Sequence, residues 1–383
     1  MRELPMRQTQ RIEPVYTGDV SGAASALFEL GGMVVLHDPS GCNSTYNTFD
    51  ETRWYDQDSL VFLSGLKESD ALMGNDRRLV DDVVAAARDL APRFVALVAS
   101  PIPYLVGSDL DALAATIGRE CGVPCFALPT NGMHDYVRGA GAAFAEVARR
   151  FVDDARPQPR HLNILGATPL DLMADGALGS IRAWVEGAGW QVTSCWAMGD
   201  TLDGLGRAAQ GSVNLVVSAT GMAAAKVLRE RFGTPWVAGT PVPGFADGLA
   251  RALDAAERTG ECSAPCGSRR ADAPAATAVV VGEPVAMGSV AVALAGRLGR
   301  PFRLVCPLEA DNALLGAGDV LARGEEEVAR ELEGADLIVA DPLWKLVAPP
   351  AARFLSVPHL AFSGRVYRGE AIDLAHLMEG GSL

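Results

Sequence analysis

The stretch MVVLHDPSG, residues 33–41, contains the pattern that decides the fold of this chain. A short apolar run of strand-forming residues ends in a polar residue and a proline, which stops a strand and begins a turn. The full pattern recurs in FVALVASPIP (94–103), LNILGATPLD (162–171), AVVVGEPVAMG (278–288) and LIVADPLWK (337–345). A sixth apolar run, NLVVSATGM at 214–222, lacks the proline.

Alanine-rich segments with helical spacing separate these runs, for example RRLVDDVVAAARDLA at 77–91. Apolar strands that alternate with helices predict parallel sheets covered by helices on both faces. Breaks at 153–161 and 260–278 divide the chain into 1–157, 158–262 and 263–383. We therefore expect an α/β fold of three Rossmann-like domains with parallel sheets around a central cleft. Cys262 and Cys266, in the second break, are interpreted as thiols of a flexible surface loop.

Composition and charge argue against several classes of function. The chain has 383 residues and a formal net charge of −14, and its Lys and Arg residues do not form the clusters that nucleic-acid binding requires. No apolar run approaches the ~20 residues of a membrane span. The first 14 residues lack the apolar core of a secretory signal. We expect a cytoplasmic protein without nucleic-acid or membrane partners.

The turns after the strands are the expected location of any ligand site, because open α/β sheets bind ligands at the carboxyl ends of their strands. Neither a phosphate-binding P-loop nor the dinucleotide fingerprint occurs in these turns, so no nucleotide is expected on this chain. Cys42 follows Gly41 in the first turn. Such a cysteine is often a small buried residue, but a thiolate stabilised by backbone N–H groups also suits an iron–sulfur cluster. The residues alone leave both alternatives open.

The segment HDPSGCNSTYN, 37–47, resembles the HGPxGC turn that carries a cluster cysteine in nitrogenase component 1 proteins, the molybdenum–iron protein family and its relatives. Five later segments resemble the α-subunit branch of that family in the same order. They are GLKESDALMGNDRRLVDDV (65–83), VASPIPYLVGSDLDAL (98–113), LPTNGMHDYVRGAGAAFAEVARRF (128–151), SATGMAAAKVLRERFGTPW (218–236) and SVPHLAFSGRVYRG (356–369). The resemblance also implies three Rossmann-like domains.

The resemblance implies a [4Fe-4S] or related cluster, for which α-type subunits usually supply three cysteines. Here only Cys42, beside Gly41, matches; Asp19 and Ser100 fall at the other two positions. Oxygen atoms can ligate iron, and the related light-independent protochlorophyllide reductase is similar in using an aspartate. Cys42, Asp19 and Ser100 are therefore the implied metal ligands. The alternatives are a turn-capping side chain at Asp19 and a strand-end hydrogen bond at Ser100.

By the resemblance, Ser218 falls at the position of the cysteine that holds the iron–molybdenum cofactor in nitrogenase. The histidine that holds the other side of that cofactor has no clear match here, although His359 lies nearby in sequence. We therefore expect neither that cofactor nor dinitrogen reduction. Asn131 and His134 are expected to line a substrate cleft with Ser218. His134 is a weak candidate for a catalytic proton donor near neutral pH. A solvent-facing loop is the alternative for His134.

The resemblance implies a subunit of a two-component, nitrogenase-like reductase. An ATP-dependent iron–sulfur reductase would supply electrons through a cluster at a subunit interface. A second component 1-type subunit, in a heterodimer or heterotetramer, would complete the ligand set; a homodimer is also possible. The substrate would be a small or tetrapyrrole-type molecule. The alternatives are a scaffold for metallocluster or cofactor assembly that performs no turnover, and a clusterless α/β ligand-binding protein.

Overall fold

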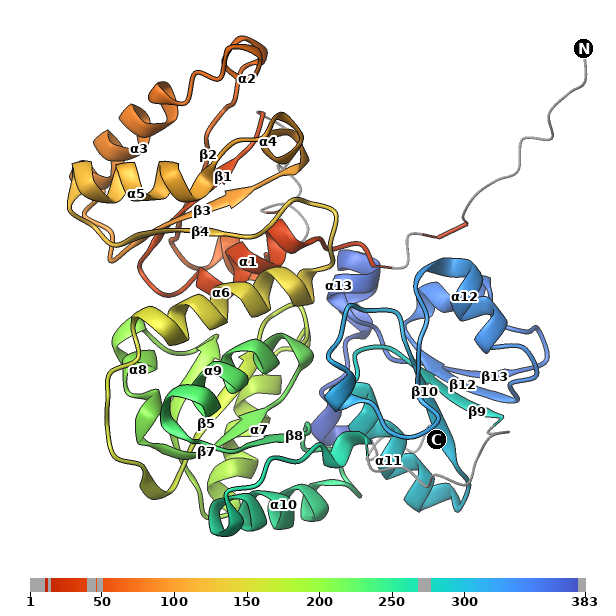
Figure 1. The fold of residues 1–383 in the computed structure, drawn as a ribbon. Helices are drawn as coiled ribbons and strands as arrows, with labels where there is room; N and C mark the ends of the chain where they lie inside the picture. Colours follow the sequence, from red (N-terminus) through yellow and green to blue (C-terminus); the bar gives the residue numbers. More distant parts are fainter. Residues whose placement is uncertain (1–10, 13–14, 40–45, 47–50, 268–276, 378–383) are drawn as a thin grey trace, which may run out of the picture.

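The computed structural model describes residues 11–12, 15–39, 46, 51–267 and 277–377. Within these residues the chain forms three separate sheets, and every strand pairing is parallel. Helices surround each sheet (Figure 1). The predicted α/β fold with three parallel sheets is confirmed. Gly41 and Cys42 lie outside the described residues.

The first sheet has the strand order β2-β1-β3-β4. Strands β1 and β3 are buried along their whole length, as expected for central strands covered on both faces. Helices α3 and α5 pack on one face, and α1 and α6 pack on the other (Figure 1). The bounds are β1 Met33–His37, β2 Leu60–Leu63, β3 Val95–Ala99, β4 Cys125–Leu128, α1 Asp19–Leu27, α3 Arg77–Leu90, α5 Leu110–Cys121 and α6 Tyr136–Arg150.

The second and third sheets have the strand orders β6-β5-β7-β8 and β11-β10-β9-β12-β13. The second contains β5 Gln158–Ala167, β6 Gln191–Ala197, β7 Gly211–Val216 and β8 Trp236–Ala238, with α7 Ala177–Gly187, α8 Leu202–Gly206, α9 Met222–Phe232 and α10 Ala246–Thr259. The third contains β9 Ala278–Val281, β10 Phe302–Cys306, β11 Val320–Leu321, β12 Leu337–Ala340 and β13 Arg353–Ser356, with α11 Ala286–Leu298, α12 Gly324–Glu331 and α13 Leu360–Ser363.

Helices α1 and α6 cross closely between the first and second sheets (Figure 1). Two glycines permit the contact. A Cβ atom on Gly22 would lie 2.2 Å from the carbonyl oxygen of Tyr136, and one on Gly139 would lie 1.8 Å from that of Asp19. Helix α6 also packs against α9 of the second domain. The crossing therefore fixes the start of α1 against the start of α6, where several predicted site residues lie.

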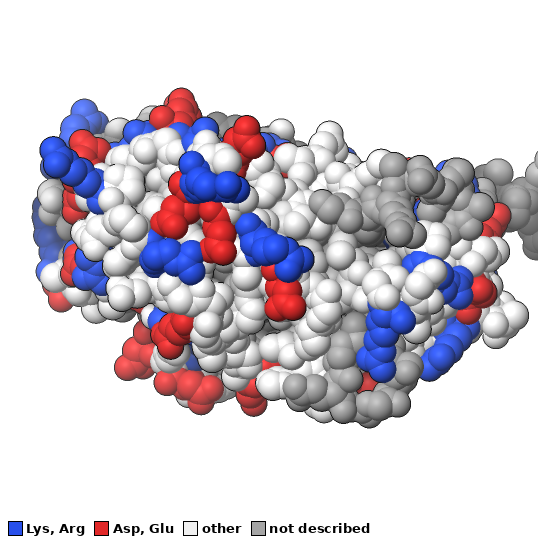
Figure 2. Space-filling view, turned by 90° about the horizontal axis from the view of Figure 1, so that it is seen from below, with Lys and Arg blue, Asp and Glu red and all other residues white. Residues whose placement is uncertain are grey.

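The strands of each sheet fall within one of the three predicted ranges, while the boundaries themselves stay a prediction. The interpretation of the second break as a loose loop was wrong for Cys266, which is fully buried in the core. Across the described ranges, no helix has the length and apolar character needed to cross a membrane. Figure 2 shows acidic and basic side chains interspersed on the face that is lowest in Figure 1.

Candidate functional site

The carboxyl edge of the first sheet brings together the ends of β1 and β3. His37 pairs with Ala99 in the parallel register, so Asp38 and Ser100 follow neighbouring strands at the same edge. The backbone N–H of Ser100 donates to the carbonyl of His37 over 3.3 Å. Asp38 and the following Pro39 lead directly toward residues 40–45, which include Cys42 and lie outside the described residues.

Two polar side chains at this edge are buried without a hydrogen-bond partner in the described part of the chain. Ser100 is 1% exposed and its Oγ accepts and donates nothing; Asp38 is 0% exposed and both of its carboxylate oxygens are unpaired. Ser100 precedes helix α4, Pro101–Val106, but its side chain does not cap that helix. Because an unsatisfied buried polar group is costly, these oxygens require an explanation such as an additional bound group.

Asp19 is also buried at this edge, but its carboxylate is fully engaged. Oδ2 accepts the backbone N–H of Asn131 over 3.0 Å, and Oδ1 accepts that of Gly132 over 2.8 Å. Burial raises the pKa of Asp19, although the two backbone donors oppose that shift. A Cβ atom on Gly132 would lie 2.5 Å from Cδ of Pro101, so this turn packs directly beside Ser100. The geometry therefore favours a turn-fixing role for Asp19.

The donor set at the edge agrees in part with an iron–sulfur cluster. Within the described ranges no three His, Cys, Asp or Glu side chains gather closely enough to hold a metal ion. Because oxygen can ligate iron, the unpaired oxygens of Ser100 and Asp38 are suitable contacts for an iron–sulfur cluster that binds beside them. Ligation by Cys42 or Asp19 stays a prediction. Gly41 and Cys42 belong to the part of the chain that is not described.

His134 lies in the cleft where the three domains meet. Its Nδ1 is 3.0 Å from Oε2 of Glu309, which follows β10 in the third domain. The neighbouring Asp135 accepts the backbone N–H of Glu309 over 2.5 Å, and burial raises the pKa of Asp135 to about 6. Asn131 does not line this cleft: it lies at the sheet edge, where its Oδ1 accepts the backbone N–H of Met133 over 2.9 Å.

Ser218 lies under the floor of the cleft and is fully buried. Its Oγ is 2.7 Å from Oδ2 of Asp171, 2.6 Å from the hydroxyl of Thr220 and 2.9 Å from a backbone carbonyl. Asp171 also accepts hydrogen bonds from the hydroxyls of Thr168, over 2.7 Å, and Tyr136, over 2.6 Å. The Ser218 hydroxyl is thus saturated by protein oxygens, and it does not fit an iron–molybdenum cofactor.

Glu283 is the second buried carboxyl group of this region and lies in the turn after β9. Its oxygens accept the backbone N–H groups of Ala219, Val285 and Ala286 over 2.6–3.0 Å. Burial, and then the nearby charge of Asp171, raise the pKa of Glu283 to about 8. The buried carboxyl group of Glu283 is therefore held toward its protonated form by its surroundings.

The third domain contributes His359, whose Nε2 is 3.4 Å from Oδ1 of Asp171. The ring stacks on Phe362, with ring centroids 4.5 Å apart. His359 and Asp171 both line a small cavity of about 40 Å³, with mostly apolar side chains around them. A cavity of that volume admits a few water molecules or a very small molecule.

Sequence reasoning identified Ser218 but missed the roles of Asp171, Glu283, Tyr136 and His359. A partial signal was present, because Asp171 and Glu283 lie in turns that follow predicted strands. Nothing in the local sequence shows that these two carboxyl groups face one another from different domains. Their meeting depends on how the second and third sheets pack.

Comparison with known families and proteins adds a second line of observation. The model of the nitrogenase component 1 type oxidoreductase family matches residues 19–300. The chain is 23% identical over 217 residues to the nitrogenase molybdenum-iron protein alpha chain of Clostridium pasteurianum, covering 53% of this chain and 40% of that protein. It is 26% identical over 242 residues to the nitrogenase iron-molybdenum cofactor biosynthesis protein NifE of Klebsiella pneumoniae, covering 57% and 51%. The chain thus spans about half the length of the curated relatives it matches.

Solved structures of nitrogenase Cp1 share the fold. The structure at pH 6.5 superposes with a TM-score of 0.64 at 16% identity, covering 93% of this chain and 88% of that one. The structure at pH 5 gives a TM-score of 0.59 at 16% identity, covering 91% and 82%. The fold agrees with the family match, which extends over more than half of the sequence. The chain therefore belongs to the nitrogenase component 1 type oxidoreductase family.

Proposed function

We propose that this chain is one subunit of a nitrogenase-like two-component reductase whose iron–sulfur cluster lies at the carboxyl edge of the first sheet. The observation that carries the proposal is the buried, unpaired hydroxyl of Ser100 beside the unpaired carboxylate of Asp38. Cys42, three residues beyond Pro39, would supply a thiolate. An iron–sulfur cluster, when bound, would supply one-electron transfer. Asp19 would hold the turn at 131–132 that encloses this edge.

The surface around this edge supports a second chain as the source of further ligands. Helix α4 begins directly after Ser100 and exposes large apolar side chains, with Leu105 71% exposed. It contacts α2, Glu68–Met73, whose Leu72 and Met73 are 78% and 82% exposed. Exposed apolar clusters of this kind commonly mark protein interfaces. The occupant we propose is a second component 1-type subunit, and the ATP-dependent reductase would dock on the assembled pair.

The test is co-expression of this chain with a component 1-type subunit encoded in the same genome, followed by anaerobic purification. We expect a stable complex that contains iron and sulfide and gives a cluster signal in electron paramagnetic resonance. Cys42→Ser should remove or alter that signal, whereas Cys121→Ser, at a half-buried cysteine on α5, should not. Leu105→Glu should weaken the association. An unchanged signal in Cys42→Ser would overturn the assigned ligand.

A scaffold for cofactor assembly is the second candidate. The observation that favours it is the 26% identity to NifE, a cofactor biosynthesis protein. Reoxidation of the reduced cluster by candidate substrates, dependent on the reductase and ATP, distinguishes the two functions. A reductase turns over many substrate molecules per cluster. A scaffold instead releases a cofactor or cluster to a recipient protein without such turnover.

A further inference from the structure

The chain that follows Cys42 is held in place at a turn formed by residues 51–55. The backbone N–H of Glu51 donates to the carbonyl of Tyr46 over 2.9 Å, and the ring of Trp54 packs edge-on against that of Tyr46, with centroids 6.4 Å apart. Tyr46 is 2% exposed and comes four residues after Cys42. Because four residues span at most about 14 Å, a group that fixes this turn also restricts the position of Cys42.

Glu51 and Arg53 form a buried ion pair at the centre of the turn. Glu51 is 0% exposed; its Oε1 accepts the Nε–H of Arg53 over 2.8 Å, and its Oε2 accepts an Nη2–H over 2.8 Å. Oε2 also accepts the hydroxyl of Ser25 in α1 over 2.9 Å. The guanidinium lies over the ring of Phe28, 4.6 Å from its centroid. A forked guanidinium–carboxylate pair fixes orientation as well as distance, so the turn is held against α1 in one geometry.

The guanidinium of Arg53 also contacts the second domain. Its Nη1–H groups donate to Oε1 of Glu29 over 2.8 Å and to the carbonyl of Ala197 over 3.1 Å. Glu29 in turn accepts the backbone N–H of Gly199 over 2.7 Å. Ala197 ends β6 with a φ of 97°, a strained conformation that persists only where neighbouring groups hold it. Side chains of the first domain therefore hold this bend of the second domain beside the turn.

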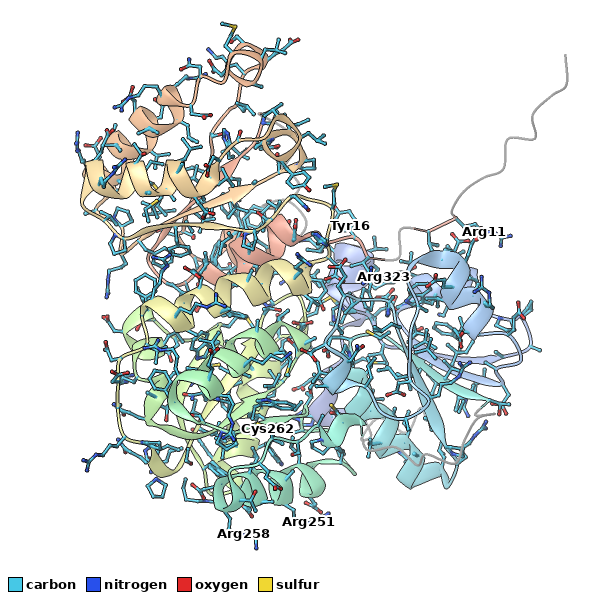
Figure 3. All side chains as sticks on the ribbon, in the orientation of Figure 1. Arg11, Tyr16, Arg251, Arg258, Cys262 and Arg323 are labelled. Atoms are coloured by element: carbon cyan, nitrogen blue, oxygen red, sulfur yellow. The ribbon has the colours of Figure 1, made fainter. Side chains whose placement is uncertain are left out.

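The third domain contacts the same turn through the segment that follows α13. Arg365 donates an Nη2–H to the carbonyl of Glu51 over 3.1 Å, and its guanidinium lies 5.6 Å from the ring centroid of Tyr55. The preceding residue, Gly364, lies beside Tyr16, since a Cβ atom on Gly364 would be 3.8 Å from the Tyr16 ring. Figure 3 shows Tyr16 where the first and third domains meet. This one turn therefore contacts all three domains.

We propose that Glu51 and Arg53 are positioning residues for the cluster: they fix the segment that begins at Cys42 against all three domains, so that the surroundings of the cluster depend on how the domains are arranged. This role rests on the proposed function, because it concerns the cluster assigned there to Cys42. The reduction potential of an iron–sulfur cluster responds to the hydrogen bonds around its sulfurs and to its exposure to solvent. A change in the ion pair should therefore alter the cluster before it removes the cluster.

The experiment uses the anaerobically purified complex of this chain with a component 1-type subunit. Arg53→Lys keeps a positive charge beside Glu51 but cannot make the forked contact, because an ammonium group has no planar pair of donors. Glu51→Gln combined with Arg53→Met removes both charges, so that no unpaired ion is buried. Both variants should keep most of the wild-type iron. The g-values of the cluster in electron paramagnetic resonance, and its midpoint potential in a redox titration, should shift from those of wild type.

Arg365→Ala tests the contact with the third domain separately. It removes the hydrogen bond to the carbonyl of Glu51 and leaves the buried ion pair in place. The g-values and the potential should shift in this variant too, but less than in Arg53→Lys. Unchanged values in Arg365→Ala would overturn the part of the proposal that concerns the third domain.

Two controls on α10 separate positioning from a general loss of stability. Leu253→Ala truncates a fully buried side chain and should lower the unfolding midpoint, but it should leave the g-values and the potential unchanged. Arg258→Gln, at an exposed residue of the same helix, should change none of these quantities. In Figure 3, Arg251 and Arg258 mark α10 at the end of the second domain that lies away from Tyr16.

Identical g-values and potentials in wild type and in both ion-pair variants would overturn the positioning role and leave the proposed function standing. So would an equal shift in Leu253→Ala, because the effect would then follow stability alone. Loss of iron from Arg53→Lys, at an unfolding midpoint no lower than that of Leu253→Ala, would support the role. A wild-type complex without an iron–sulfur signal would instead overturn the proposed function, and the positioning role with it.

Discussion

Oδ1 of Asp171 lies 3.4 Å from Nε2 of His359, although the two residues belong to the second and third domains. The same oxygen accepts the hydroxyl of Tyr136, which begins helix α6 of the first domain, over 2.6 Å. One carboxylate with a side chain 1% exposed therefore contacts all three domains. The way in which the domains hold together can be tested at this single group.

Asp171→Asn should lower the free energy of unfolding by about 2–4 kcal/mol, because three hydroxyl donors share this one carboxyl group as acceptor in a buried site. Urea denaturation measures the change. Asp175→Asn, at an exposed position of the same loop, is the control and should be within about 0.5 kcal/mol of wild type. Equal stability of the two variants would mean that the network contributes nothing to domain packing.

The raised pKa of Glu283 predicts that the folded state loses stability as pH rises. Its pKa is about 8 in the folded chain and 4.5 ordinarily, so between these values the folded state binds more protons than the unfolded state. The contribution is fully present below pH 4.5 and disappears as pH rises through 8. Relative to Glu283→Gln, the wild type should lose stability between pH 5 and 8 by up to about 1.4 kcal/mol per pH unit. Parallel pH profiles of the two proteins in urea would contradict the assignment.

Ser100→Ala tests whether the Ser100 hydroxyl is a cluster ligand or has only a structural role. Since the buried Oγ has no partner among the described residues, its removal should leave the free energy of unfolding of the isolated chain unchanged or raise it by about 1 kcal/mol. The iron content of the co-expressed complex should fall if the hydroxyl ligates the cluster. Thr130→Ala is the comparison, because that hydroxyl accepts the backbone N–H of Ala99 over 2.9 Å and its loss should destabilise the chain.

Gly139→Ala tests the crossing of α1 and α6. The added methyl group would lie 1.8 Å from the carbonyl oxygen of Asp19, so the helices must separate. We expect a loss of about 1–3 kcal/mol in the free energy of unfolding. Gly179→Ala in α7 is the matched control, because nothing lies within 4 Å of its added Cβ, and it should gain about 0.5–1 kcal/mol. Similar values for both would show that α1 and α6 tolerate a wider spacing.

Much of the fold was predictable from the sequence because buried parallel strands have a continuous apolar pattern. The stretch MVVLH became β1 and the stretch VALVA became β3, each buried throughout. The same reasoning predicted that Ser100 lies at the carboxyl edge of its sheet, and the family resemblance added Asp19, which does lie beside it. Their predicted metal ligation depends on a partner chain and on Cys42, so it stays a prediction.

The interior of the site was less accessible to sequence reasoning. Ser218 was expected in the cleft, but it lies beneath Ala219, which lines the cleft instead. Asp171 turns inward and binds the Ser218 hydroxyl, because the loop after β5 brings its carboxylate under α9. Such contacts between residues far apart in sequence leave no local pattern. Cys266 illustrates the same limit, since its neighbours are small and polar yet it packs in the core.

The close crossing at Gly139 has a consequence for communication within the molecule. The backbone of Asp19 touches α6, while its side chain fixes the turn that leads through His134 into that helix. The direct backbone contact between α1 and α6 therefore fixes the distance from the carboxyl edge of the first sheet to the junction of the domains. Any displacement of the start of α1 at the sheet edge is therefore passed directly to the start of α6 at the junction of the domains.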